Sequence, residues 1–578
     1  MTGELISIVE IDQPLCSRVY GSSPCTAAIG TTGTDKCFNT WSTCQDQANY
    51  DGSETLTLRF CSEVENPPRD VQLIPILDSV SSRPTELNII GADPGASPLG
   101  KRAKLSASLR DITYHDRLTD PYWRDRSYDP TTRGTFWSKW LARNRNYATY
   151  PVRVRRGTVD QALNAMQTEH FILDRIDGPG SQGSVKLTAK DVLALADNDR
   201  AVAPQPSKGR ISAGISEAAT VPITATLTPS GIGSEYPASG SVRIGREIFT
   251  FTRSSDTLTL TARAQNGTDA ESHNADDTAQ VCYIASGQRV DEVIEDLLTN
   301  YAGVDGAYIN ASDWGDEAAT WLSTYDLYGI VSEPTGVTKL LGEILQVCTC
   351  YVWWDAENQT IKFRALRPEI TTRDVNDRQH ILADSLVQET KPDERVTQLI
   401  IFYDQIDPTE RQNEGANYRR ARVFVPGGTR APTDTDERVK IIHTRWLTAA
   451  NEGEIVNTGI KIMQRFSEAP VKTVFSVDRS QADIELADVV DLSHYSITDA
   501  YGQPYEFPAQ IIAAEYTDSG TRLRLTAVPY YFAGRFGYIV ANGTLDYLFA
   551  SGNERQLGAW WSQDDGEFSN GDPAYVWL

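Results

Sequence analysis

The residues best suited to chemistry are the cysteines, which gather near the start of the chain. Five of the eight lie in the first 61 residues, at Cys16, Cys25, Cys37, Cys44 and Cys61. The first four follow the pattern C-x8-C-x11-C-x6-C within a stretch rich in Gly, Ser and Thr. That stretch has too few large apolar side chains to build a core of its own. Four thiolates bound to one metal centre would hold it together.

The spacing leaves three interpretations of these four cysteines open. They could bind an iron–sulfur cluster, bind zinc, or be unconnected thiols, because free cysteine is often buried. Zinc ribbons usually carry paired C-x2-C knuckles, which this sequence lacks, and long irregular gaps fit a cluster wrapped by loops better. Cys61 follows an alternating segment and is expected to pack nearby without binding metal. Cys282, Cys348 and Cys350 are expected in core positions.

Composition and charge narrow the class of protein. The chain has 578 residues, 40% hydrophobic and 23% charged, which is typical of a globular protein of several domains. A net charge of −24 disfavours stable nucleic-acid binding and suits a surface that nucleic acid passes without adhering. We see neither a secretory signal nor a membrane span. We therefore expect synthesis in a reducing cytoplasm, no stable membrane insertion and no disulfides.

We expect the fold that positions the cysteines to be α+β, mainly β, with several domains. Turn signals and changes in composition divide the chain into six parts. These are a cysteine-rich segment (1–70), a first β domain (71–204), a small inserted all-β module (205–284), an α+β part (285–365), a second α+β domain (366–530) and an aromatic segment that docks on a partner (531–578).

Periodicity predicts the helices. Apolar residues at three-four spacing predict helices over 288–303 and 337–348, and a further helix near 454–466. Two shorter helices are expected, one over 158–166 capped by Thr158 and one over 189–197 started by Thr188. Between them, residues 170–187 are expected to form a β-hairpin.

Motifs for catalysis are missing from the sequence. Gly178 to Gly183 spells G-x-G-x-x-G, but a strand follows where a phosphate site needs a helix N-terminus. Gly95 to Lys101 resembles a Walker loop, but Arg102 replaces the magnesium-binding Ser or Thr. The chain has no G-x-S-x-G elbow and no H-E-x-x-H helix, and its six histidines show no ligand spacing. We therefore expect a protein that is not an enzyme.

Residues 117–157 form a basic stretch in this acidic chain. They hold ten Arg and Lys residues against three Asp, interleaved with aromatic side chains. Such a stretch could bind nucleic acid by stacking and charge, or form a protein–protein interface anchored by Trp, Tyr and Arg. The strong negative charge of the whole chain favours the interface.

Several segments resemble one known family. The cysteine segment CSRVYGSSPC…KCFNTWSTCQDQANY is similar to that of tail hub proteins from long-tailed phages and phage-like gene transfer agents, in particular the lambda-like tail tip proteins. GTFWSKWLARN (134–144) and residues 170–197 also look like hub sequence. Residues 240–281 resemble a small β module of phage tail proteins. The usual sequence pattern of that module, RG-x-x-GT-x-A-x-x-H, is altered to ARAQNGTDAESH in this chain.

The resemblance implies a virion structural protein at the tail tip, built on β-barrel domains. It implies a homotrimeric ring that closes the tail tube and lines the DNA exit channel. Its partners would be the distal tail and tail tube proteins, the tape measure protein and a central fibre or spike. Cys16, Cys25, Cys37 and Cys44 match the ligands of a [4Fe-4S] cluster, with zinc as the alternative. In lambda-like proteins this segment lies towards the C-terminus, so the domain order differs. The alternatives are a receptor-binding tip protein or a cell-wall hydrolase.

Overall fold

The strands nearest the N-terminus form a seven-stranded antiparallel sheet that curls into a nearly closed barrel. The structure is a computed structural model, and it describes residues 3–65, 67–68, 71–91, 97–367, 369, 371, 373–425, 437–481, 483–517 and 521–530. The strand order in the barrel is β2-β1-β5-β6-β7-β4-β3. A bridge between Phe60 and Ile74 brings its two edges together. The strands are β1 (Leu5–Leu15), β2 (Glu54–Cys61), β3 (Leu77–Arg83), β4 (Lys104–Arg110), β5 (Pro151–Thr158), β6 (Gln167–Asp177) and β7 (Ser184–Lys190).

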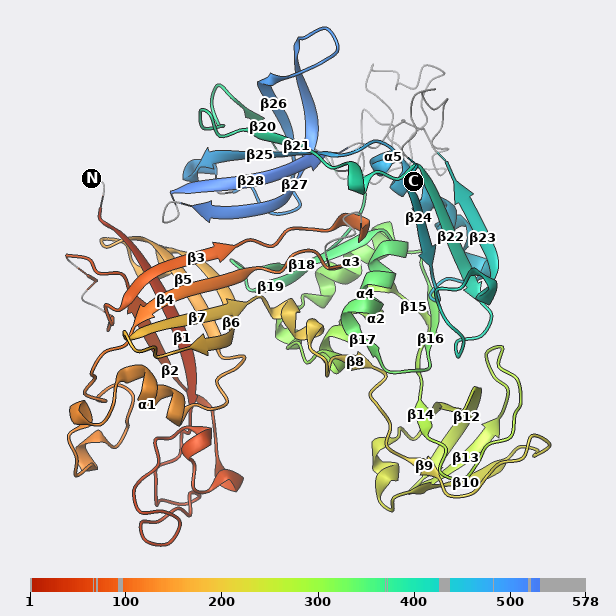
Figure 1. The fold of residues 1–578 in the computed structure, drawn as a ribbon, viewed down its shortest axis with the longest axis horizontal. Helices are drawn as coiled ribbons and strands as arrows, with labels where there is room; N and C mark the ends of the chain where they lie inside the picture. The colour runs from red at the N-terminus through yellow and green to blue at the C-terminus, as the bar shows by residue number, and fades with distance from the viewer. Residues whose placement is uncertain are drawn as a thin grey trace, which may run out of the picture.

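Alternation explains the interior of the barrel. In β1, Val9 and Ile11 point into a core that also holds Phe60, and helix α1 (Phe136–Arg143) adds Trp137, which is fully buried. The expected segment 1–70 therefore contributes two strands to the same sheet as strands from the expected domain 71–204. Figure 1 shows this barrel on the left, with the chain between β1 and β2 below it.

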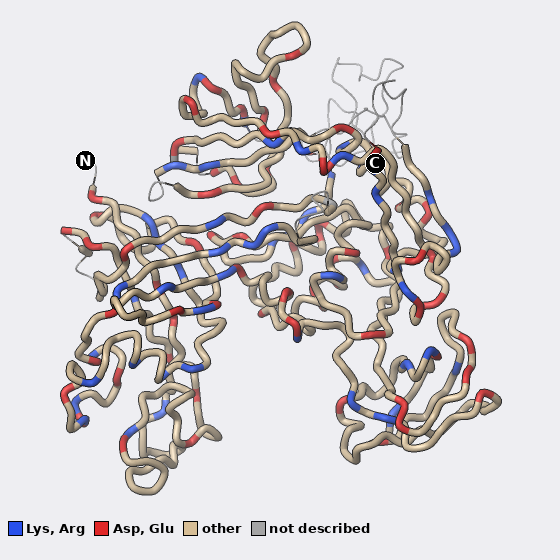
Figure 2. Tube along the Cα trace, viewed as in Figure 1, with Lys and Arg blue, Asp and Glu red and all other residues tan. Residues whose placement is uncertain are grey.

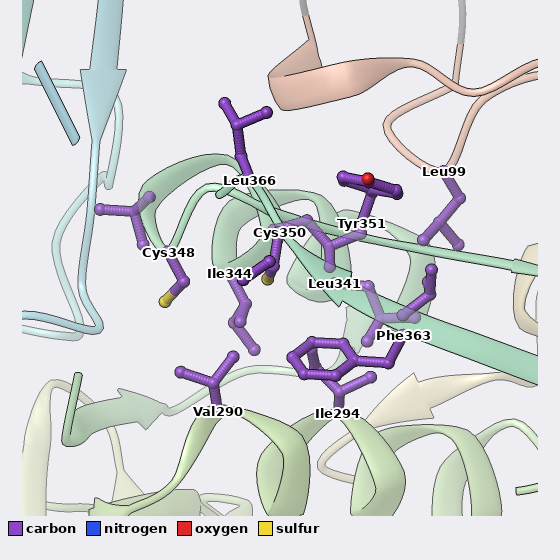
Figure 3. Packing of buried hydrophobic residues seen from close by; sticks show 14 of the residues in the cluster. Leu99, Val290, Ile294, Leu341, Ile344, Cys348, Cys350, Tyr351, Phe363 and Leu366 are labelled. Carbon is purple, nitrogen blue, oxygen red and sulfur yellow. The ribbon is translucent and has the colours of Figure 1, made fainter. Parts of the chain in front are cut away.

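The centre of the molecule is a helix-rich core that joins the other parts. Val290, Ile294, Leu341 and Ile344 pack together from two helices, and Cys348 and Cys350 lie in the same cluster (Figure 3). Its elements are β8 (Val202–Ala203), β15 (Tyr283–Gln288), α2 (Val290–Asp296) with a π-helical turn (Leu297–Tyr301), α3 (Ala311–Trp321), β16 (Leu327–Val331), β17 (Thr335–Gly336), α4 (Val337–Val347), β18 (Cys350–Asp355) and β19 (Thr360–Ala365).

The inserted module is a six-stranded sheet with its own apolar core. Its motif residues are structural: the fully buried Glu247 accepts two 2.8 Å hydrogen bonds from Arg263 and lies 3.0 Å from the His273 ring nitrogen Nε2. Thr268 accepts a hydrogen bond from the backbone of Ile248. The strands are β9 (Arg210–Ile211), β10 (Ile223–Thr228), β11 (Ser239–Ile244), β12 (Glu247–Ser254), β13 (Thr257–Ala262) and β14 (Ala279–Val281).

Residues after 366 form two further sheets. A six-stranded sheet has the order β20-β26-β27-β28-β25-β21, and a three-stranded sheet, β23-β22-β24, packs on helix α5. Their elements are β20 (Asp374–Asn376), β21 (Val387–Thr390), β22 (Gln398–Gln405), β23 (Tyr418–Phe424), β24 (Val439–His443), α5 (Glu452–Phe466), β25 (Val471–Asp478), β26 (Val489–Thr498), β27 (Pro504–Thr517) and β28 (Arg522–Pro529).

The mainly β, α+β fold class and the three periodic helices are confirmed. The short helix predicted over 158–166 was wrong, and the one predicted over 189–197 is present only as a shorter 3-10 helix. Thr158 ends strand β5, opposite Leu5 of β1, and only a 3-10 turn at Leu163–Ala165 follows. Thr188 lies within β7; Asp191 caps a 3-10 helix at Val192–Asp197. In both places strand pairing took residues that local capping had assigned to a helix. The aromatic segment 531–578 lies outside the described residues.

Charge of both signs is spread over all the sheets (Figure 2). Among the described residues, no helix has the length and apolar character needed to cross a membrane.

Candidate metal centre in the loop between β1 and β2

The cysteine segment is a long loop carried by one strand pair. β1 and β2 are antiparallel neighbours, and Leu15 at the end of β1 stands opposite Glu54 at the start of β2. Residues 16–53 therefore leave and rejoin the barrel side by side. The loop holds little apolar core of its own, with Tyr20 and Ala27 as its buried hydrophobic residues.

The four predicted ligands line one small cavity in this loop. Cys16, Cys25, Cys37 and Cys44 surround it together with polar residues of the same loop. All four are free thiols and partly buried. The remaining cysteines lie elsewhere and are buried. Cys61 packs with Ile6, Ile8 and Met166 at the end of β2 away from the loop, so the expectation that it packs near the four was wrong. Cys282, Cys348 and Cys350 are the others.

Backbone N–H groups point at two of the sulfurs. Asp46 N–H donates to Cys44 Sγ over 3.4 Å, and Asp51 N–H donates to Cys16 Sγ over 3.5 Å. Such donors favour a sulfur that carries negative charge, as a metal-bound thiolate does. The loop thus supplies polar support at its sulfur atoms as well as the sulfurs themselves.

In the metal-free chain two of the thiols are held in their protonated form. Burial raises the pKa of Cys37 and Cys44 above the usual thiol value, and the neighbouring thiols add to the rise, although backbone hydrogen bonds oppose it. Because a metal binds the thiolate, metal uptake at neutral pH must release protons from these two residues.

Three polar residues tie the loop together. The Asn39 side-chain amide donates to Cys16 O over 3.0 Å, and Cys16 N–H donates to Asn39 O over 2.7 Å. Asp46 accepts from the backbone and hydroxyl of Thr26, while Gln45 accepts from the Tyr20 hydroxyl. Asn39 has a positive φ of 55°, a backbone region that Asn tolerates better than most residues. These contacts bring the separate cysteine turns to one place.

The basic-aromatic stretch packs onto this loop. The Phe38 ring lies between two guanidinium groups, 4.0 Å from that of Arg126 and 3.9 Å from that of Arg143. Lys139 and Arg143 form ion pairs with the buried Asp116. Arg126, Arg143 and Lys139 therefore make contacts inside the chain. The interface with another protein stays a prediction for the exposed cations of the stretch, such as Arg124 and Arg133.

The donor set fits an iron–sulfur cluster in kind and number, with four free thiols and backbone donors at two sulfurs. Among the described residues, no group of three or more His, Cys, Asp or Glu side chains is placed to hold a single metal ion. The four thiols line one shared space, and zinc remains the alternative to a cluster.

Sequence reasoning named the four cysteines but missed Asn39 and Arg126. Their signal is weak: a lone Asn between cysteines, and one Arg among ten basic residues. The G-x-G-x-x-G motif lies in the hairpin loop between β6 and β7, as expected.

No family model matches the sequence, and no curated protein matches it. Among solved structures, the chain is similar to the tail protein from Neisseria meningitidis MC58, with 9% identity, coverage of 78% of this chain and 96% of that chain, and a TM-score of 0.37. The 43 kDa tail protein of prophage MuSo2 from Shewanella oneidensis gives 9% identity, 78% and 95% coverage, and a TM-score of 0.36. A chain of a native gene transfer agent virion gives 12% identity, 58% and 92% coverage, and a TM-score of 0.30.

Proposed function

We propose that this chain is a structural hub protein of a phage-type tail tip, and that its β1–β2 loop carries a [4Fe-4S] cluster on Cys16, Cys25, Cys37 and Cys44. In this role the protein forms a trimeric ring at the end of the tail tube. It links the tube to a central fibre or spike and lines the channel through which DNA leaves. It has no catalytic activity of its own.

One observation carries the metal part of the proposal: the four cysteines of the hub-like segment line a single cavity. The cluster would supply cross-linking in a loop that has almost no apolar core. The thiolates hold it, and the backbone N–H groups of Asp46 and Asp51 support the charge on two of the sulfurs.

The hub part of the proposal rests on the resemblance of residues 16–50, 134–144 and 170–197 to hub sequences, and on the chain's acidity. A net charge of −24 suits a channel wall that repels DNA and so lets it pass.

Purification without oxygen, followed by iron, sulfide and zinc assay, tests the cluster. We expect iron with matching sulfide and a brown colour. Cys25→Ser should abolish the colour, whereas the matched control Cys61→Ser should keep it, because Cys61 lies at the end of β2 away from the cavity. An assay that finds one zinc ion per chain would contradict the cluster and would identify a four-thiolate zinc site instead.

Deletion in the producing phage or particle tests the hub role. A hub is needed for assembly, so its loss should leave no complete tails in electron micrographs. Intact tails that fail only to adsorb would instead identify a receptor-binding protein. Steady solubilisation of cell walls by the purified chain would identify a hydrolase.

A further inference from the structure

The loop is held at Cys37 by a residue from far along the chain. The Arg126 guanidinium donates to Lys36 O over 2.7 Å and to Cys37 O over 3.0 Å. Its remaining donors form a bidentate pair with Asp120, at 2.8 and 3.1 Å. The Arg126 side chain is 3% exposed and that of Asp120 is 0% exposed. The Arg126 guanidinium therefore uses nearly all of its N–H donors in hydrogen bonds inside the protein.

The neighbouring side chain is fixed by the same group. Phe38 follows Cys37 in the chain, and its ring is stacked between Arg126 and Arg143. Arg143 is itself anchored by a 2.7 Å hydrogen bond to Asp116, and its backbone carbonyl accepts from the Thr40 hydroxyl over 2.6 Å. Residues 36–40 are thus held by Arg126, from the segment between β4 and α1, and by Arg143 at the end of α1.

We propose that Arg126 is a positioning residue that sets the backbone of Cys37 so that its thiol faces the cavity before any metal binds. The inference rests on the proposed function only for its metal readout. Because Asp120 already neutralises the guanidinium, the role is geometric: it depends on the planar fork that reaches two carbonyls and one carboxylate together.

That geometry separates this role from simple charge compensation. A lysine at position 126 keeps the positive charge but cannot reproduce the fork. If Arg126 merely balanced the negative charge of a bound cluster, Arg126→Lys would behave like the natural chain. If Arg126 positions Cys37, the Arg126→Lys variant should lose the fixed position of the Cys37 thiol, because lysine cannot reach the two carbonyls and the carboxylate together.

The first measurement uses the reduced, metal-free chain and follows alkylation of each thiol by mass spectrometry. We expect Arg126→Lys to speed alkylation of Cys37 about tenfold, with Cys61 unchanged as an internal standard. The control is Arg133→Ala, an exposed cation of the same stretch that stacks on Tyr128. A rate for Cys37 equal to that of the natural chain would overturn the inference.

The second measurement follows iron loss to a chelator after anaerobic loading. We expect loss about tenfold faster in Arg126→Lys than in Arg133→Ala. A double variant, Arg126→Met with Asp120→Leu, removes the ion pair without leaving a buried charge and should show both effects in a folded chain. Equal iron retention in these variants would also overturn the role. If the natural chain takes up no iron, the cluster proposal fails, and the alkylation rates still decide the role of Arg126.

Discussion

Asp191 and Ala103 hold each other in a reciprocal pair: Asp191 N–H donates to Ala103 O over 3.1 Å, and Ala103 N–H donates to the Asp191 carboxylate over 2.9 Å. The same carboxylate caps the 3-10 helix by accepting from Ala194 N–H. The pair stands where the barrel strands β4 and β7 meet the helix-rich core. It joins these two parts of the fold through a side chain that is fully buried.

The burial of Asp191 predicts a stability change in mildly acidic solution. Burial raises the pKa of Asp191 to about 6, although Arg102 and the backbone donors oppose the rise. A raised pKa means that this group favours folding fully below its unfolded value near 4 and loses that contribution as pH rises through about 6. We expect a loss of about 2 kcal/mol across this window, measured by denaturant unfolding. Asp191→Asn should flatten it; an unchanged slope in that variant would assign the dependence to other groups.

The environment of Glu10 predicts that stability changes with pH in the opposite direction. This residue is 1% exposed and binds Arg59, Arg153 and Arg155. Burial works to raise its pKa, but Arg153 and Arg155 outweigh burial and hold the pKa below its usual value. The stabilisation is therefore present at neutral pH and is lost as pH falls below about 4.

Glu10→Ala should lower the free energy of unfolding at neutral pH by about 3 kcal/mol, because three guanidinium groups lose their shared partner. Glu63→Ala is the control, since its pair with Arg110 is largely exposed and should change stability by less than about 0.5 kcal/mol. Equal effects of the two changes would contradict the importance of this buried network.

Two glycines of helix α5 predict opposite effects of the same substitution. A Cβ at Gly459 would stand 2.3 Å from the Phe424 ring, whereas a Cβ at Gly453 meets nothing within 4 Å. Alanine favours helix, so Gly453→Ala should stabilise by up to about 1 kcal/mol. Gly459→Ala should instead destabilise by about 1 to 3 kcal/mol, because the clash outweighs that gain. Chemical denaturation measures both, and stabilisation by Gly459→Ala would show that α5 packs more loosely on β23.

The inserted module should be removable. Its two ends run side by side, since Ser207 N–H donates to Gln280 Oε1 over 3.0 Å and Val281 N–H donates to Ser207 Oγ over 3.0 Å. Replacing residues 208–280 by a short Gly-Ser linker should leave the remaining chain folded, with its melting temperature within about 3 °C. The isolated segment 205–284 should fold around its own core. Aggregation of the shortened chain would show that the module supports the rest.

The sequence predicted best where a single physical pattern dominates. Apolar spacing predicted α2 and α4, and the residue type together with the family resemblance pointed to four cysteines that do lie around one cavity. The prediction of a helix capped by Thr158 was wrong, because the pairing of β5 with β1 depends on residues far away in the sequence.

The contacts of Arg126 could not be predicted from the sequence for the same reason. Its partners at Lys36 and Cys37 lie about ninety positions earlier in the chain. Composition marked residues 117–157 as basic and aromatic, but only the fold shows that Arg126 and Arg143 enclose Phe38. Long-range side-chain geometry of this kind leaves no local periodic trace.

The pairing of Leu15 with Glu54 makes the cysteine loop separable from the barrel that carries it. A segment whose two ends adjoin on neighbouring strands needs only a hairpin as its base, so it can be transplanted as a cassette without rerouting the polypeptide. Any antiparallel hairpin whose strands end side by side offers the same two attachment points, so the sulfur-rich loop is compatible in geometry with a hairpin elsewhere in a chain.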